Sequence, residues 1–210
     1  MKDLWLIRHA ESLANIGEST STPREIPLSE HGLKQADDLA NSIDERPDLI
    51  VVSPYIRTRQ TAEPFFELYP AVEVETSLVQ EFTYLSVSRC RGTNSAQRRP
   101  WAAEYWERAD PNYCAGDQSE SFAEFIGRCS RFTSQIRERE FELAFVFTHG
   151  QFIQGLLWHS MRFGREITKE SMQAFQKFIT AFSIPNMAII RAKIDHDGQF
   201  YFGKIDSSLT

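Results

Sequence analysis

Short apolar runs alternate with longer amphipathic stretches along most of the chain, and the short runs predict buried strands. One run is weaker, because Glu73 and Glu75 alternate in it with apolar neighbours, as residues do at the edge of a sheet. Near the end of the chain, two runs flank Asp197-Gly198 and predict a hairpin. The predicted strands are Leu4–Arg8, Leu49–Val52, Val72–Thr76, Leu143–Phe147, Met187–Ile194 and Phe200–Ile205.

Apolar residues at helical spacing predict helices between most of these strands. Ser29 is a good cap for the first helix, whose pattern stops before Pro47, and Pro64 should bend or divide the second. The predicted helices are Ser29–Ile43, Arg57–Tyr69, Ser121–Ile136, Gln151–Trp158 and Glu170–Phe182. Strands that alternate with helices predict an α/β fold, a three-layer α/β/α sandwich with a mostly parallel central sheet.

Residues 86–118 interrupt this alternation. They mix Arg, Gly, Asn, Pro and aromatic residues without sustained periodicity, so we expect an irregular insertion over one end of the sheet. The chain has 210 residues, 41% of them hydrophobic, and contains no internal repeat and no long linker. We therefore expect a single domain over residues 1–210.

The charge and cysteine content exclude several classes of protein. A formal net charge of −6 argues against broad binding of nucleic acid or of anionic membranes, which attract basic surfaces. The first apolar run is much shorter than the core of a secretory signal, and no stretch is long enough to span a bilayer. Three cysteines, Cys90, Cys114 and Cys129, suggest neither a disulfide framework nor a zinc site. We expect a cytoplasmic protein.

Three predicted strands end in residues that bind anions. The first ends in Arg8-His9, the second is followed by Ser53 and Arg57, and the fourth leads into Thr148-His149-Gly150. Ligands of open α/β sheets usually bind outside the carboxyl ends of the strands. If these ends lie side by side, two histidines and two arginines converge on one anion site.

Phosphate is the anion that suits these side chains. A guanidinium binds two phosphoryl oxygens at once and can neutralise the charge of a group in transfer. A neutral imidazole is a competent nucleophile, because its unperturbed pKa is about 6.5. A second histidine can donate to the transferring group, and the backbone amides of Gly150 and Gln151 would add the positive end of a helix dipole.

Five ordered segments resemble the motifs of the histidine phosphatase superfamily, whose best-known members are the cofactor-dependent phosphoglycerate mutases. The resemblance covers most of the chain except roughly residues 86–118. One position departs from the pattern, since Ala10 stands where the family usually has glycine. The segments are Leu6–Ser12 with Asn15, Leu28–Gly32 with Gln35-Ala36, Ser53–Ala62, Leu78–Phe82 and Val146–Gly150.

The resemblance implies a phosphoglycerate-mutase-like fold and a role for each matched residue. His9 would attack phosphorus, and Arg8, Arg57, Asn15 and His149 would bind the phosphoryl oxygens. Glu81 would protonate the leaving alkoxide and later help to deprotonate water. No metal and no cofactor are implied. The expected partner is a small phosphorylated substrate, with no nucleic acid and no membrane, and a homodimer stays open.

The superfamily contains phosphatases and mutases, and Phe82-Thr83-Tyr84-Leu85 lacks the glycine-rich, basic stretch that follows the acidic residue in the mutases. We therefore favour a phosphomonoester hydrolase that forms a phosphohistidine. The alternatives are a phosphoglycerate-mutase-type phosphotransferase, a catalytically inactive relative that binds phospho-ligands, and a phosphoprotein phosphatase. Arg98 and Arg99 would either bind a second negative group of the substrate or form a solvated basic turn.

Overall fold

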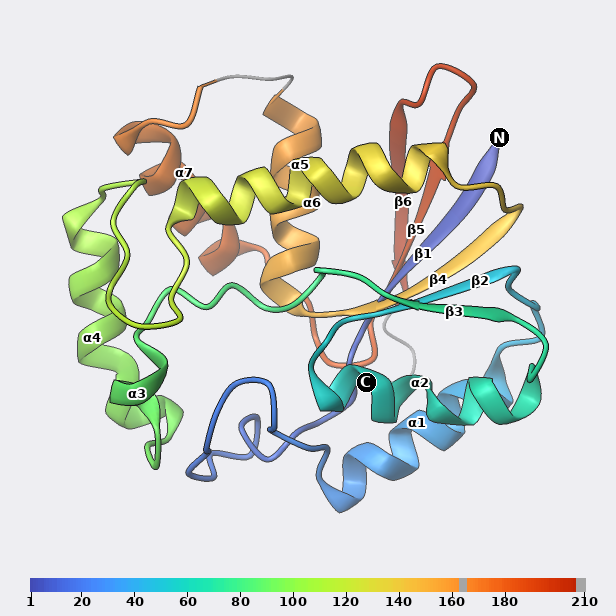
Figure 1. Cartoon of the computed structure of the whole chain (residues 1–210), viewed down its shortest axis with the longest axis horizontal. Helices are drawn as coiled ribbons and strands as arrows, with labels where there is room; N and C mark the ends of the chain where they lie inside the picture. Colours follow the sequence, from blue (N-terminus) through green and yellow to red (C-terminus); the bar gives the residue numbers. More distant parts are fainter. Residues whose placement is uncertain (163–165, 207–210) are drawn as a thin grey trace.

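The computed structural model describes residues 1–162 and 166–206 and contains a six-stranded sheet in the order β3-β2-β4-β1-β5-β6 (Figure 1). The first four of these strands run parallel to one another, whereas β5 is antiparallel to both β1 and β6. This arrangement confirms the predicted mostly parallel sheet with a terminal hairpin. The strands are β1 Lys2–Arg8, β2 Leu49–Val52, β3 Glu73–Thr76, β4 Leu143–Thr148, β5 Ile189–Ile194 and β6 Phe200–Asp206.

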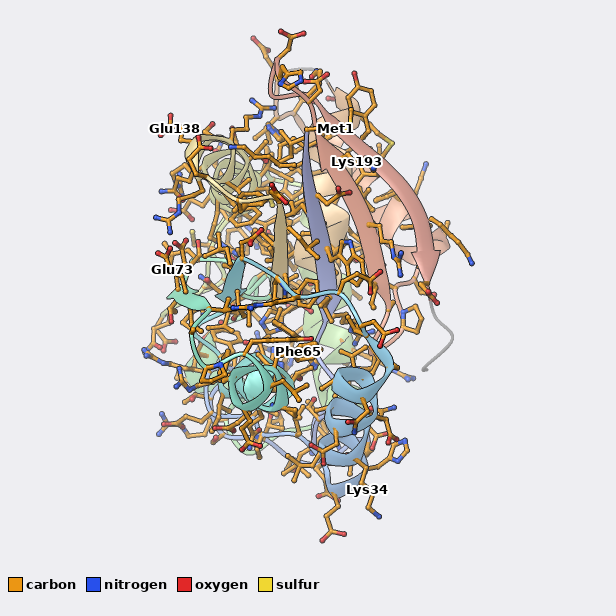
Figure 2. All side chains as sticks on the ribbon, turned by 90° about the vertical axis from the view of Figure 1, so that its right-hand side faces the viewer. Met1, Lys34, Phe65, Glu73, Glu138 and Lys193 are labelled. Atoms are coloured by element: carbon orange, nitrogen blue, oxygen red, sulfur yellow. The ribbon has the colours of Figure 1, made fainter. Side chains whose placement is uncertain are left out.

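Helices cover both faces of the sheet, as the sandwich requires. On one face, α1 and α2 pack against Trp5 and Ile7, and on the other face α5, α6 and α7 pack against Leu4 and Leu6. Figure 2 shows Phe65 of α2 in the interior. The helices are α1 Glu30–Ser42, α2 Ile56–Leu68, α3 Val87–Cys90, α4 Ser95–Arg108, α5 Phe122–Glu138, α6 Gly150–Arg162 and α7 Lys169–Ala181.

The burial of both faces explains why the central strands are continuously apolar. Successive side chains of a strand point to opposite faces, so a strand covered on both sides needs apolar residues at every position. All four residues of β2 are buried, and so are Leu4 to Ile7 of β1. By contrast, β3 lies at the edge of the sheet, as the charge alternation predicted, and its Glu73 and Glu75 are paired with Arg139 at 2.5 and 3.3 Å.

One detail of the sequence prediction was wrong. Residues 86–118 are not irregular throughout, because they contain α3 and α4. A capping box formed by Asn94 and Gln97 starts α4, and Tyr105 and Trp106 bury its apolar side. Of the two effects expected of Pro64, a division of α2 does not occur, because the helix runs through it from Ile56 to Leu68. A proline removes only one amide donor, and the buried neighbours on either side hold the helix together.

The loop after β1 lies against the first turn of α1. Ser29 caps α1 by accepting a hydrogen bond from the Gly32 amide at 2.9 Å, and its own amide donates to the Glu11 carbonyl at 2.9 Å. A Cβ atom on Gly32 would lie only 1.9 Å from that carbonyl oxygen. Glycine therefore permits the close approach that fixes the start of this loop.

Among the described residues, no helix has both the length and the apolar character that crossing a bilayer requires.

We predict that Gly32→Ala lowers the free energy of unfolding by about 3 kcal/mol, because the added methyl must displace backbone atoms. Gly127→Ala is the matched control. Gly127 lies inside α5, and its Cβ would meet nothing closer than Arg131 Nη1 at 3.5 Å. That change should be neutral or stabilise the protein by up to about 1 kcal/mol. Urea denaturation of both variants measures the difference, and equal stabilities would contradict the prediction.

Candidate active site

The carboxyl ends of β1, β4 and β2 lie next to one another and bring the predicted residues together. Arg8 pairs with Thr148 in the parallel register of β1 and β4, and the His9 amide donates to the Thr148 carbonyl at 3.0 Å. Ser53 follows β2 directly, and its amide donates to Phe147 of β4 at 3.2 Å. The rings of His9 and His149 are 5.0 Å apart between centroids.

Arg57, in the first turn of α2, connects the two histidines. Its Nε donates to His9 Nε2 at 3.1 Å, and its Nη2 is 3.0 Å from His149 Nδ1. The third guanidinium nitrogen, Nη1, donates to the Pro23 carbonyl at 2.7 Å. Burial lowers the pKa of Arg57 to about 10, so its charge is retained at neutral pH. A buried cation thus stands between two imidazoles.

The hydrogen bonds assign the proton of His9. A guanidinium has donors only, so His9 Nε2 must carry a lone pair. Nδ1 lies 2.7 Å from the Ala10 carbonyl, an acceptor, and must carry the proton. Burial, followed by the charges of Arg57 and Arg8, holds the pKa of His9 well below its usual value of 6.5. His9 is therefore neutral, with its lone pair on Nε2.

His149 is neutral for the same reasons, but it lies deeper. It is fully buried, and its pKa is held well below 6.5 by burial and then by the charge of Arg57. Nδ1 accepts from Arg57, which leaves Nε2 to donate to Ser53 Oγ at 2.8 Å. His149 does not line the cavity that His9 lines. A direct bond from His149 to a phosphoryl oxygen requires one of these two hydrogen bonds to be exchanged.

The cavity at this edge of the sheet has a volume of about 460 Å³, which is within the usual range for small-molecule sites. Seven of the nine residues predicted for the site line it. His149 and Gly150 do not. The seven are Arg8, His9, Asn15, Arg57, Glu81, Arg98 and Arg99.

Glu81 is the only carboxylate among the lining residues of this cavity. Its Oε1 accepts from the Gln151 amide at 3.0 Å, at the start of α6, and from the Phe82 amide at 3.3 Å. Burial raises the pKa of Glu81, and the charges of Arg8 and Arg57 oppose that rise. The start of α6 thus binds this carboxylate, whereas the sequence suggested that its amides would face the phosphate.

Arg8 has donors left for a ligand. One guanidinium nitrogen, Nη1, bonds to the Ile184 carbonyl, whereas the buried Nε has no hydrogen-bond partner. Gly150 lies directly against this side chain, because a Cβ there would be 3.4 Å from Arg8 Nε. Gly150 thus packs beside the guanidinium at ordinary contact distance.

Asn15 and Asn186 lie near the loop that begins at His9. Asn15 Oδ1 accepts from the Ser12 amide at 3.0 Å and from the Ser12 hydroxyl at 2.7 Å. Asn186, from the loop before β5, donates to the carbonyls of His9 and Ala10 at 2.8 and 3.1 Å. It is a supporting residue that sequence reasoning missed, because its partners lie at the opposite end of the chain.

Arg98 and Arg99 are adjacent in the sequence but differ in their hydrogen bonding and exposure. Arg98 bonds to Thr93 Oγ1 at 2.8 Å and to Thr20 Oγ1 at 2.6 Å, and it also reaches the carbonyls of Cys90 and Thr93. It thereby ties α4 to the loop after β1, which passes beside α3 (Figure 1). Arg99, by contrast, is exposed and lines the cavity.

A buried ion pair that sequence reasoning also missed supports the Glu81 segment. Arg128 binds Glu120 through two bonds, Nη2 to Oε1 at 2.5 Å and Nε to Oε2 at 3.1 Å. Arg128 Nη1 donates to the carbonyls of Leu78 and Gln80 at 3.0 and 2.8 Å. The signal was an arginine on the apolar face of a predicted helix, where a charge needs a partner.

Within residues 1–162 and 166–206, no group of three His, Cys, Asp or Glu side chains is arranged to hold a metal ion. The chemistry available at the site is that of a neutral imidazole, guanidinium groups and one carboxyl.

Known structures share this fold. An alpha-ribazole phosphatase from Shigella flexneri is 21% identical, with a TM-score of 0.74 and coverage of 98% of this chain and 96% of that one. A phosphoserine phosphatase from Entamoeba histolytica, in complex with 3-phosphoglyceric acid, is 18% identical, with a TM-score of 0.72 and coverage of 99% and 98%. A mycobacterial glucosyl-3-phosphoglycerate phosphatase with VO3 is 19% identical, with a TM-score of 0.72 and coverage of 98% of both chains.

No curated protein sequence matches the chain. The family model described as the histidine phosphatase superfamily (branch 1) matches residues 4–201, which is nearly the whole sequence. The resemblance seen in the five motifs is thereby confirmed, and the chain belongs to the histidine phosphatase superfamily.

Proposed function

We propose that the chain hydrolyses the phosphomonoester of a small metabolite through a phosphohistidine on His9. The observation that carries this proposal is the hydrogen bonding of His9. Nδ1 is committed to the Ala10 carbonyl, so the lone pair is on Nε2, in a cavity that Arg8 and Arg57 also line. Membership in the superfamily supports phosphatase activity.

In the first step, His9 Nε2 attacks phosphorus and the ester P–O bond breaks. The phosphoryl oxygens accept hydrogen bonds from Arg8 Nε, which has no other partner, and from Arg57 Nε. Arg57 Nε releases its bond to His9 Nε2 when the lone pair of that nitrogen attacks phosphorus. Glu81 gives its proton to the leaving alkoxide, a role that its raised pKa favours.

In the second step, water attacks the phosphohistidine. The carboxylate of Glu81 takes a proton from the water, the P–N bond breaks, and inorganic phosphate leaves. The acid is thereby restored, and the sum of both steps is hydrolysis of the ester to an alcohol and phosphate. In this proposal His149 holds Arg57 in place, since Arg57 is the group that it contacts.

Two alternatives make different demands on the site. A protein that only binds phospho-ligands needs no acid beside the nucleophile. Glu81 lines the same cavity as His9, and burial raises the pKa of its carboxyl, so this residue favours an enzyme. A mutase returns the phosphoryl group to an organic acceptor and must exclude water. The sequence Phe82–Leu85 favours the phosphatase. Release of inorganic phosphate from a single ester distinguishes all three.

We predict that His9→Ala lowers kcat for an aryl phosphate by at least about 10³-fold, because the nucleophile is lost. His31→Ala is the control, since His31 is exposed on α1 and should keep full activity. Release of inorganic phosphate measures turnover, and acid quenching with mass spectrometry detects the phosphoenzyme. Normal turnover by His9→Ala would remove the assignment of the nucleophile.

A pH profile tests the paired roles of His9 and Glu81. The pKa of His9 is lowered, so the neutral nucleophile persists below pH 6.5. The pKa of Glu81 is raised, so the protonated acid persists above its usual value of 4.5. We therefore predict that kcat for an alkyl phosphate is largest on the acid side of neutrality and falls as the pH rises and Glu81 ionises. An optimum above about pH 8 would contradict the assignment of Glu81.

A further inference from the structure

The part of the cavity beyond the phosphate site is mostly apolar. It is formed by three segments, namely the loop after β1, residues 82–85, and the helices α3 and α4. These segments present aliphatic and aromatic side chains to the cavity. The apolar lining residues are Ala14, Pro23, Ile26, Phe82, Tyr84, Leu85, Val87, Cys90 and Ala102.

Most polar side chains of these three segments are already engaged. Arg98 makes its bonds to Thr20, Thr93 and Cys90, and Thr83 Oγ1 is bonded to the Tyr55 hydroxyl at 2.9 Å. The polar side chains that remain for a ligand include those of Ser95 and Arg99, both exposed on α4, and that of Gln151 on α6. A substrate with many hydroxyl groups would lose its bonds to water in this cavity and regain few of them.

From this lining we propose that the substrate is a phosphomonoester of a predominantly apolar alcohol, and not a sugar phosphate or a phosphorylated hydroxy acid. The inference rests on the proposed function and deepens it. Apolar area that is removed from water stabilises the complex, whereas a buried polar group without a partner destabilises it. Both effects favour an apolar alcohol over a polyol.

A matched pair of substrates tests this preference. 2-Phenylethyl phosphate and glycerol 3-phosphate are both esters of primary alcohols, so the chemical step is similar and differences report the fit of the alcohol. We expect kcat/KM to be at least about 30-fold larger for the phenylethyl ester. A ratio near one, or a preference for the glycerol ester, would overturn the inference while leaving the proposed hydrolysis intact.

Substitutions in the apolar lining of the cavity test whether this lining causes the preference for the phenylethyl ester. Ala102→Asp on α4 and Leu85→Asn each place a polar group in the apolar wall and should reduce the ratio at least about tenfold. Leu33→Asp is the control, because Leu33 is an exposed leucine on α1 outside the cavity. It should leave the ratio unchanged. Wall variants with an unaltered ratio would count against the inference.

A binding measurement separates this inference from the proposed function. Calorimetric titration of His9→Ala with the two esters measures the same preference without turnover. Absence of hydrolysis by the unaltered protein would overturn the proposed function. Tighter binding of the phenylethyl ester would still support the apolar class of ligand, and equal binding would overturn it.

A separate observation concerns residues 77–86, which connect β3 to α3 without helix or strand and carry Glu81. Side chains hold this segment by its backbone. Arg128 binds the carbonyls of Leu78 and Gln80, and Thr148 Oγ1 binds the Val79 carbonyl at 2.5 Å. Glu120 accepts from the Thr83 amide at 3.2 Å and donates its own amide to the Thr83 carbonyl at 2.9 Å.

We infer that Arg128 and Glu120 are positioning residues for the acid Glu81, since their bonds bracket it on both sides. The pair is joined by two parallel bonds, and Arg128 is buried. Two parallel bonds fix the relative orientation of the two side chains, and the backbone groups that these side chains bind are therefore held in place as well. This inference also rests on the proposed role of Glu81 as the proton donor.

The dependence on the leaving group distinguishes positioning from simple stability. 2,4-Dinitrophenolate leaves without a proton, whereas phenolate benefits from one. We expect Arg128→Lys and Glu120→Gln to lower kcat/KM, which reports the first step alone, at least about tenfold more for phenyl phosphate than for 2,4-dinitrophenyl phosphate. Arg131→Lys, an exposed neighbour on α5, should change neither rate. Equal losses on both substrates would overturn the positioning role.

Glu81→Gln serves as the reference for that comparison. If Glu81 is the proton donor, Glu81→Gln shows the same selective loss on phenyl phosphate. If Glu81→Gln lowers both rates equally, the proposed role of Glu81 fails, and the inference about Arg128 fails with it. If only Glu81→Gln shows the selective loss, the assignment of Glu81 as the acid stands and the positioning role of Arg128 and Glu120 is overturned.

Discussion

The central constraint of this structure is that one guanidinium touches two imidazoles. Arg57 can only donate, so the nitrogens that it meets on His9 and His149 must both be unprotonated. The remaining nitrogen of each ring then has a fixed partner, the Ala10 carbonyl for His9 and the Ser53 hydroxyl for His149. The site consequently holds two neutral imidazoles beside a positive charge, which is the arrangement that the proposed transfer of a phosphoryl group requires.

The strand order of the sheet brings these three side chains together. Parallel strands β1, β4 and β2 are adjacent, so residues that follow them in the sequence meet at one edge. Arg57 reaches that edge because α2 begins only four residues after β2 ends. Apolar side chains on both faces of the strands keep water away from the ring nitrogens, and this burial is the largest cause of the lowered pKa values of both histidines.

Features with a local signal could be predicted from the sequence. The apolar runs and the cap at Ser29 indicated the strands and α1, and the residues at the strand ends indicated which side chains meet at the candidate site. α4 was missed because Arg98-Arg99-Pro100 interrupts its apolar periodicity, although the capping box of Asn94 and Gln97 was visible in the sequence.

Features that depend on distant partners could not be predicted. The bond between Arg98 and Thr20 joins residues 78 positions apart, and the bonds of Arg128 to residues 78 and 80 span 50 and 48 positions. The depth of His149 behind Arg57 likewise follows from packing and not from its own neighbours in the chain. These long-range contacts decide which charged groups face the cavity and which support it.

The protonation of His9 in the ligand-free protein tests the account most directly. In ¹⁵N spectra of histidine-labelled protein at about pH 6, assigned with a His9→Ala variant, we expect a neutral ring with the proton on Nδ1 and a lone pair on Nε2. A proton on Nε2, or a positively charged ring at that pH, would contradict the claim that the contact with Arg57 keeps this nitrogen unprotonated.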